Sequence, residues 1–168
     1  MAIFEPAFDQ MLKNEGGYVL HDVTGDRGGM TYAGIARNMN ADWAGWELID
    51  RKEFSSELTA MVRDFYRDAY WRPIRGDDLP QEIAESIFDF GVNSGTRTAV
   101  KLAQLVVGSQ PDGVLGPKTV EALAAMDGDS FKKSYALAKV ARYAAICNSN
   151  RTQSKFLLGW INRTLKSL

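Results

Sequence analysis

Hydrophobic residues recur at helical spacing over most of the chain. Near the start they predict a helix from Glu5 to Glu15, and the pair Gly16-Gly17 is typical of a helix end. Pro80 is suited to the first turn of another helix. Further helical stretches share the same spacing of apolar residues and are expected near 54–69, 80–93, 96–107, 118–126, 131–146 and 156–168.

One segment departs from this pattern. Residues 18–35 are rich in Gly, Asp and Thr, with short β-prone runs on either side of the letters TGDRGG. Such a segment predicts a small hairpin or a Gly-rich loop. The expected fold class is therefore mainly α, with one small β element after the first helix. A length of 168 residues favours one domain or a compact pair of lobes.

Composition narrows the possible chemistry. The chain has one cysteine, Cys147, and one histidine, His21, so we expect neither a disulfide framework nor a multi-histidine or cysteine-based metal site. No run approaches about 20 apolar residues, the length of a membrane-spanning helix. The N-terminal letters MAIFEPAFDQ lack the basic and apolar regions of a signal peptide, so we expect synthesis in the cytoplasm without one.

Charge is unevenly distributed. All 21 acidic residues lie at or before Asp129, whereas residues 130–168 carry eight Lys and Arg and no acid. This C-terminal excess of +8 is compatible with a polyanionic partner, such as an acidic cell-wall polymer or an anionic lipid. The alternative is a solvated helix face that balances the acidic remainder. No basic-aromatic recognition motif accompanies the charge, so no nucleic acid is expected as a partner.

The densest group of reactive side chains surrounds the Gly-rich segment: Glu15, Asp22, Asp26 and Thr31. A carboxyl at the last turn of a helix faces the negative end of the helix dipole, which disfavours its charged form. A second carboxylate on a hydrated loop stays ionised, and two carboxyl groups in such contrasting settings are typical of glycosidic-bond hydrolysis. The alternative is that Glu15 is a plain surface residue and that Asp22 and Asp26 form turns.

Five ordered motifs extend over nearly the whole chain. They read NEGGY at 14–18 with DRGGMTYAGI at 26–35, YRDAYW at 66–71, FDFGVNSG at 88–95, DGVLGPKT at 112–119 and GWINR at 159–163. Together they resemble glycoside hydrolase family 108, the lysozyme-like N-acetylmuramidases of phage endolysins and prophages, followed by a peptidoglycan-binding segment. The resemblance implies a lysozyme-like helical fold and no cofactor or metal.

The resemblance assigns roles to individual residues. The family's catalytic acid falls on Glu15, and Thr31 falls on a threonine that helps to hold the attacking water. Asp26 matches the Asp before Gly-Gly and is favoured as the second carboxylate, with Asp22 as its rival. Met30 stands where a small residue is more usual.

A polymeric sugar also requires a binding groove with apolar faces. Aromatic rings with polar tips suit this purpose. The candidates are Tyr18, Tyr32, Tyr66, Tyr70 and Trp71. Asn93 could donate a hydrogen bond to an N-acetyl carbonyl. For each ring the alternative is core packing, and for Asn93 it is a helix C-cap.

We therefore expect a catalytic muramidase lobe over 1–91 and a helical peptidoglycan-binding segment over 92–168, packed as one globule. The expected activity is hydrolysis of the β-1,4 bond between N-acetylmuramic acid and N-acetylglucosamine by a monomeric endolysin that acts in the periplasm. A lytic transglycosylase and a non-catalytic wall-binding module are the alternatives. The basic C-terminal helix, with its apolar stripe, is expected to pack on the protein, and contact with an anionic outer envelope is a further possibility.

Overall fold

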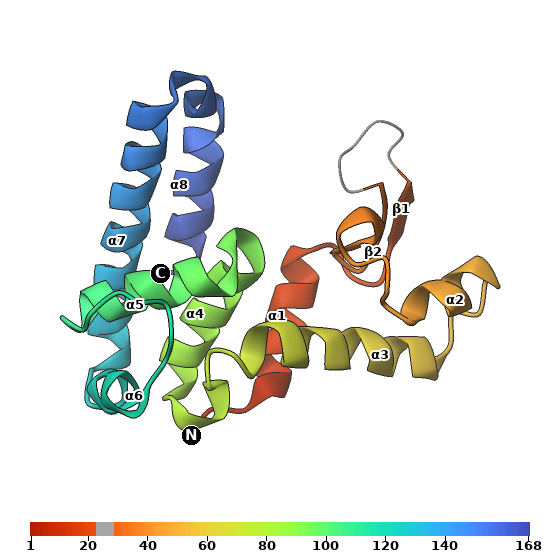
Figure 1. Cartoon of the computed structure of the whole chain (residues 1–168), viewed down its shortest axis with the longest axis horizontal. Coiled ribbons are helices and arrows are strands. Elements are labelled where there is room, and N and C mark those ends of the chain that lie inside the picture. Colours follow the sequence, from red (N-terminus) through yellow and green to blue (C-terminus); the bar gives the residue numbers. More distant parts are fainter. Residues whose placement is uncertain (23–28) are drawn as a thin grey trace. The chain divides into compact units, whose positions relative to one another are not determined.

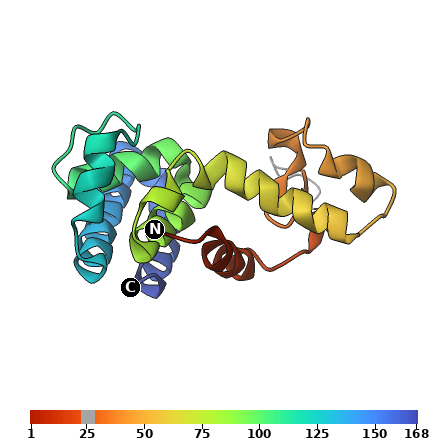
Figure 2. The same ribbon diagram turned by 90° about the horizontal axis from the view of Figure 1, so that it is seen from below.

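The computed structural model describes residues 1–22 and 29–168, and for Asp22 the strand position only. The chain forms two compact units (Figures 1 and 2). The first, here called the N-terminal unit, is Phe4–Ala69. The second, the helical unit, consists of Met1–Ile3 and Tyr70–Leu168. The boundary expected between residues 91 and 92 stays a prediction.

The N-terminal unit combines short helices with a small sheet. Its helical elements are α1 (Phe4–Asn14), η1 (Arg37–Met39), α2 (Gly45–Asp50) and α3 (Ser56–Tyr66). The sheet has the order β1-β2-β3, with antiparallel strands β1 (Leu20–Asp22), β2 (Met30–Tyr32) and β3 (Ile35–Ala36). In its register Thr31 faces His21 on β1 and Ala36 on β3.

The core of the N-terminal unit begins on α1. The buried residues of this helix recur every three or four positions and are Phe4, Ala7, Phe8, Met11 and Leu12. Full burial of one large apolar side chain stabilises a fold by roughly 1.5–3 kcal/mol, so this face contributes strongly to holding α1 in the unit. On α3, Ser55 is the N-cap and accepts a hydrogen bond from the Leu58 amide at 3.3 Å.

Between α3 and the rest of the chain lies a π-helical turn, η2 (Arg67–Trp71). The division between the two units falls within it. Such π-helical turns are rare in proteins, but those that occur are often found at functional sites. The extra residue changes the direction of the side chains that follow. The turn η2 coincides with the YRDAYW motif.

The helical unit is built around α4 (Gln81–Ser94) and α7 (Gly128–Ser149). Its other elements are η3 (Gly76–Asp78), α5 (Thr96–Val106), α6 (Pro117–Ala124), η4 (Arg151–Phe156) and α8 (Leu157–Lys166). Helix α4 packs on α5 and α7, and α8 folds back beside α7 (Figure 1). Its core includes Phe88, Ala103, Leu123 and Phe131, all buried.

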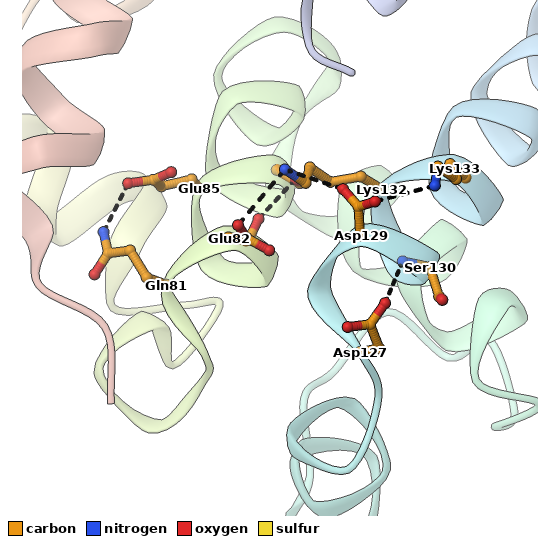
Figure 3. Close-up of polar contacts among 9 residues, drawn as sticks. Gln81, Glu82, Glu85, Asp127, Asp129, Ser130, Lys132 and Lys133 are labelled. Atoms are coloured by element: carbon orange, nitrogen blue, oxygen red, sulfur yellow. Dashed lines mark hydrogen bonds and ion pairs between the residues drawn. The ribbon is translucent and has the colours of Figure 1, made fainter.

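An ion pair connects α4 with the start of α7: Lys132 reaches Glu82 at 3.7 Å (Figure 3). Within α7, Lys133 pairs with Asp129 at 3.0 Å. The Asp127 carboxylate caps α7 by accepting a hydrogen bond from the Ser130 amide at 2.9 Å, and this bond lowers the pKa of Asp127. Part of the C-terminal positive charge is therefore balanced by acids of the helical unit itself.

A buried glutamine fixes the loop after α5. The Gln104 side chain donates to the Asp112 carboxylate at 2.8 Å and accepts from the Gly113 amide at 2.8 Å. The same side chain donates to the Val114 carbonyl at 3.0 Å. Hydrogen bonds from Gln104 and from the Val114 amide lower the pKa of Asp112. The turn at Asp112-Gly113 is thus held by an amide from inside the core.

The expected mainly α fold with a small β element after the first helix is confirmed. Two local expectations differ from the structure. The β element has a third strand, β3, because Ala33 and Gly34 both adopt positive φ values of 48° and 81° and turn the chain back directly after β2. Phe54, expected on the apolar face of a helix, precedes the Ser55 cap and is 55% exposed. No helix in the described part of the chain is long and apolar enough to cross a membrane.

Candidate active site

Glu15 occupies the C-cap of α1, and backbone hydrogen bonds hold it there. The Gly17 amide donates to the Leu12 carbonyl at 2.8 Å, and the Gly16 amide donates to the Lys13 carbonyl at 3.2 Å. This pair of bonds is the Schellman motif, which requires a left-handed residue after the cap, and Gly16 has a φ of 90°. The two glycines of the NEGGY motif therefore end α1 and place Glu15 at its negative pole.

The half-buried Glu15 side chain lies against the turn between β2 and β3. A Cβ atom added to Gly34 would lie 3.5 Å from Glu15 Cγ and only 2.5 Å from the Tyr66 hydroxyl oxygen. That hydroxyl donates a hydrogen bond of 2.8 Å to the Ala33 carbonyl. Helix α3 thus fixes the turn through Tyr66, and the absence of a side chain at Gly34 leaves room for the Tyr66 hydroxyl beside Glu15.

Two other predicted catalytic residues, Thr31 and Asp22, lie on the sheet. Thr31 is in β2, half-buried, and its hydroxyl donates to the Gly29 carbonyl at 3.3 Å. Asp22 is the last residue of β1 and pairs in register with Met30. Asp26, the favoured second carboxylate, lies outside the described residues. The choice between Asp26 and Asp22 stays a prediction.

The predicted sugar-binding tyrosines of the N-terminal unit differ in exposure. Tyr18 is 38% exposed, and its ring centroid lies 6.4 Å from that of the buried Tyr32. The ring centroid of Tyr32 in turn lies 5.9 Å from that of the exposed Phe54. Burial raises the pKa of Tyr18, and the nearby Arg63 opposes this shift. Tyr18 and Phe54 therefore offer ring surface to solvent, whereas Tyr32 supports them from beneath.

Tyr66 and Trp71 are buried and have packing partners of their own. Tyr66 forms the hydrogen bond to the turn described above. Trp71 donates from its indole nitrogen to Asp77 at 2.8 Å and packs edge-on against Phe88. These contacts agree with the alternative that both rings serve in core packing. Contact of Tyr66 and Trp71 with substrate stays a prediction. Half-buried Tyr70 and exposed Asn93 belong to the helical unit, where Asn93 donates to the Asp89 carbonyl at 2.7 Å.

Sequence patterns did not single out two further features of the N-terminal unit. One is the exposed Phe54. Recognition of Ser55 as a helix N-cap would have predicted that Phe54 lies outside the helix. The other is an open depression of about 500 Å³. It is lined by Trp43, Met61, Asp64, Phe65, Asp68 and Ala69. Apolar rings suit the apolar face of a sugar, and neighbouring carboxylates suit its hydroxyl groups. The sequence pattern that could have revealed this depression is the i, i+4 spacing of Asp64 and Asp68, which places them on successive helical turns.

The apolar stripe of the C-terminal helix is divided between protein and solvent. Trp160 stacks on Tyr143 with centroids 5.1 Å apart, which confirms the expected packing for that side of the helix. Leu158 and Leu165 are exposed. Contact of this face with an outer envelope stays a prediction.

Two family models match consecutive parts of the sequence. The model of the family described as glycosyl hydrolase 108 matches residues 8–95, and that of a predicted peptidoglycan domain matches residues 96–165. A solved structure of SagA from Brucella abortus is similar, with a TM-score of 0.71 and 31% sequence identity over 98% of this chain and 90% of that chain. This similarity confirms the lysozyme-like fold. No curated protein sequence matches the chain.

Proposed function

The chain belongs to the glycosyl hydrolase 108 family, and we propose that it hydrolyses the β-1,4 bond between N-acetylmuramic acid and N-acetylglucosamine with Glu15 as the proton donor. It is a glycoside hydrolase, and the peptidoglycan domain that follows indicates peptidoglycan as the polymer it acts on. The observation that carries the proposal is the position of Glu15: a carboxyl at the C-cap of α1, half-buried against the turn at Gly34.

The proposed reaction follows from this position. Glu15 gives its proton to the glycosidic oxygen as the bond to the muramic acid carbon breaks, so that the leaving sugar departs as a neutral alcohol. A second carboxylate, Asp26 or Asp22, stabilises the positive charge that develops on the ring or removes a proton from the attacking water. Thr31 lies on the neighbouring strand, and its hydroxyl is suited to orient that water.

The experiment that tests the bond is an analysis of the products. We expect digestion of purified sacculi to yield fragments whose new reducing ends are N-acetylmuramic acid, identified by borohydride reduction and mass spectrometry. Products that end in 1,6-anhydro-muramic acid would instead identify a lytic transglycosylase, which needs no water. New N-acetylglucosamine reducing ends would contradict the proposed bond. Sacculi that stay undigested while they bind the protein would identify a wall-binding module.

We propose in addition that the enzyme is an endolysin, as the family resemblance suggests. Expression in the bacterial cytoplasm should leave turbidity unchanged until the inner membrane is opened with chloroform, after which the culture should clear within minutes. A Glu15→Gln culture treated in the same way is the control and should stay turbid. Equal clearing of both cultures would contradict a lytic role for this site.

A further inference from the structure

The helical unit contains a cavity of about 480 Å³ between α4, α7 and α8. Helix α7 packs on both α4 and α8, and Figure 1 shows α7 and α8 side by side. The cavity is distant in sequence from Glu15, and all of its lining residues belong to the helical unit. Those used below are Asp89 on α4, Lys139, Arg142 and Tyr143 on α7, and Trp160 and Arg163 on α8.

A buried cation lines this cavity. Lys139 is only 4% exposed, and its ammonium lies 5.1 Å from the Phe90 ring and 4.9 Å from the Tyr135 ring. In the part of the chain that the structure describes, no carboxylate forms an ion pair with it. Asp89, the acid of the cavity, pairs with Arg163 at 3.3 Å instead. Cation–π contacts offset only part of the cost of burying an ammonium without a counter-ion.

The balance of charge in the cavity is positive. Arg142 lies three residues after Lys139 on α7 and lines the same space, and Arg163 adds a third cation against the single carboxylate of Asp89. Burial lowers the pKa of Lys139 to about 8, Asp89 opposes the shift, and Arg163 adds to it. Uncompensated positive charge in a cavity indicates a binding site for an anion.

An aromatic surface adjoins these cations. The rings of Trp160 and Tyr143 are stacked, with centroids 5.1 Å apart and planes inclined by 30°. Such a surface suits the apolar face of a sugar or of a short peptide. The cavity therefore combines cations that suit an anion with an aromatic surface that suits an uncharged group. A ligand that matches both carries a carboxylate next to a sugar or a peptide.

We propose that this cavity binds a carboxylate of the peptidoglycan stem peptide, with Lys139 and Arg142 as its cationic contacts and Trp160 against the adjoining part of the muropeptide. In an intact wall the lactyl acid of muramic acid is bound in an amide, so the free carboxylates belong to the stem peptides. The inference rests on peptidoglycan as the partner and not on Glu15 catalysis. Its role is to hold the enzyme on peptide-bearing strands.

Stability measurements separate a binding role of Lys139 from a structural one. Lys139→Met keeps the apolar stem and removes the buried charge, so we expect the thermal midpoint at pH 7 to equal or exceed that of the parent. The pKa of Lys139 is about 8 in the folded protein and 10.5 ordinarily, so between these values the unfolded chain binds more protons and the parent gains stability as pH rises. The difference in thermal midpoint between Lys139→Met and the parent should therefore become smaller as the pH rises from 8 to 10.5.

This pH dependence must be read against the neighbouring charged groups. Asp89, Arg142, Arg163, Tyr135 and Tyr143 face Lys139 from the three helices, and burial raises the pKa of Tyr135 well above its usual value. They are present in both proteins, so the difference between parent and variant isolates Lys139. A variant that is less stable than the parent at pH 7 would make Lys139 a structural residue and would overturn the proposal.

Binding is measured on the full chain carrying Glu15→Gln, so that the ligand is not digested. The probe is the disaccharide tetrapeptide released from sacculi, titrated by calorimetry. We expect Lys139→Met to weaken binding by about tenfold or more, as for loss of a charged hydrogen-bond partner, and Arg142→Gln to weaken it in the same direction. Lys133→Met is the matched control: it lies on the same helix, pairs with Asp129 outside the cavity (Figure 3) and should bind like the parent.

A second probe tests the carboxylate itself. The same muropeptide with its carboxylates converted to carboxamides should bind the parent as weakly as the natural probe binds Lys139→Met, and Lys139→Met should cause no further loss. Equal binding of the two probes by the parent, or equal binding of the natural probe by the parent and by Lys139→Met, would overturn the proposal. The proposal would also be overturned if Lys139→Met weakened binding to phosphatidylglycerol vesicles and left binding to the muropeptide unchanged. Failure of sacculus digestion with intact muropeptide binding would contradict the proposed catalysis alone.

Discussion

Glu15→Gln should abolish digestion of peptidoglycan while the protein stays folded. The amide has nearly the same shape as the carboxyl, so the Schellman bonds that end α1 and the contact with Gly34 are retained. What it loses is the proton, and general acid catalysis of this kind contributes roughly 10²–10⁴-fold to the rate. The measurement is the initial rate of clearing of a suspension of purified sacculi, with folding checked by circular dichroism.

Glu53→Gln is the matched control for this experiment. Glu53 is an exposed residue between α2 and α3 of the same unit, and its substitution changes the net charge by the same amount. We expect its clearing rate to equal that of the parent. Retention of more than about a tenth of the activity by Glu15→Gln would mean that another group supplies the proton, and the site assignment would then be wrong.

Gly34→Ala should lower both stability and activity. Its backbone has a φ of 81°, which costs an L-residue about 1–2 kcal/mol, and the new methyl carbon would lie 2.5 Å from the Tyr66 hydroxyl oxygen. Overpacking of this kind adds typically about 1–3 kcal/mol. Because Glu15 contacts the same turn, its displacement by a fraction of an ångström should reduce activity by about tenfold to a hundredfold. Thermal unfolding and sacculus clearing well below the midpoint measure the two effects.

Two variants separate backbone strain from the steric clash. Gly108 has a φ of 68° and no atom within 4 Å of an added Cβ, so Gly108→Ala should lose stability through strain alone and keep its activity. Tyr66→Phe removes the oxygen that the methyl group of Gly34→Ala would meet. In the double variant the loss of stability should therefore be smaller than the sum of the single losses. Strict additivity would show that Tyr66 and Gly34 do not interact as the structure has them.

The sequence predicted the long helices well because each carries its own apolar face. The patterns around Phe8, Phe88 and Phe131 predicted α1, α4 and α7, and in the structure these residues are buried. The signals for helix ends were also local. Gly16 ends α1 and Asp127 begins α7 through hydrogen bonds within a few residues, so both could be recognised without knowledge of distant parts of the chain.

Elements that depend on distant partners were predicted less well. Helix α2 has only six residues and little periodicity, and Arg37 ties it to η1 through a paired ion bridge to Asp50 at 2.7 Å. Strand β3 has two residues, and the turn before it is held by a hydrogen bond that the Ala33 carbonyl accepts from Tyr66, which is 33 positions away in the chain. Such contacts leave no periodic trace in a sequence.

The sequence by itself determined that the chain is mainly helical, that Glu15 ends the first helix beside a Gly-rich β element, and which family it resembles. These features rest on apolar spacing, on the conformational freedom of glycine and on ordered motifs, all of which are local. Only the tertiary structure decided that Glu15 lies against the Gly34 turn that Tyr66 holds, that Phe54 is exposed, and that Lys139 is a buried cation without a carboxylate partner among the described residues. The reason is that burial and electrostatic environment depend on segments far apart in the chain, which are brought together only when the core forms.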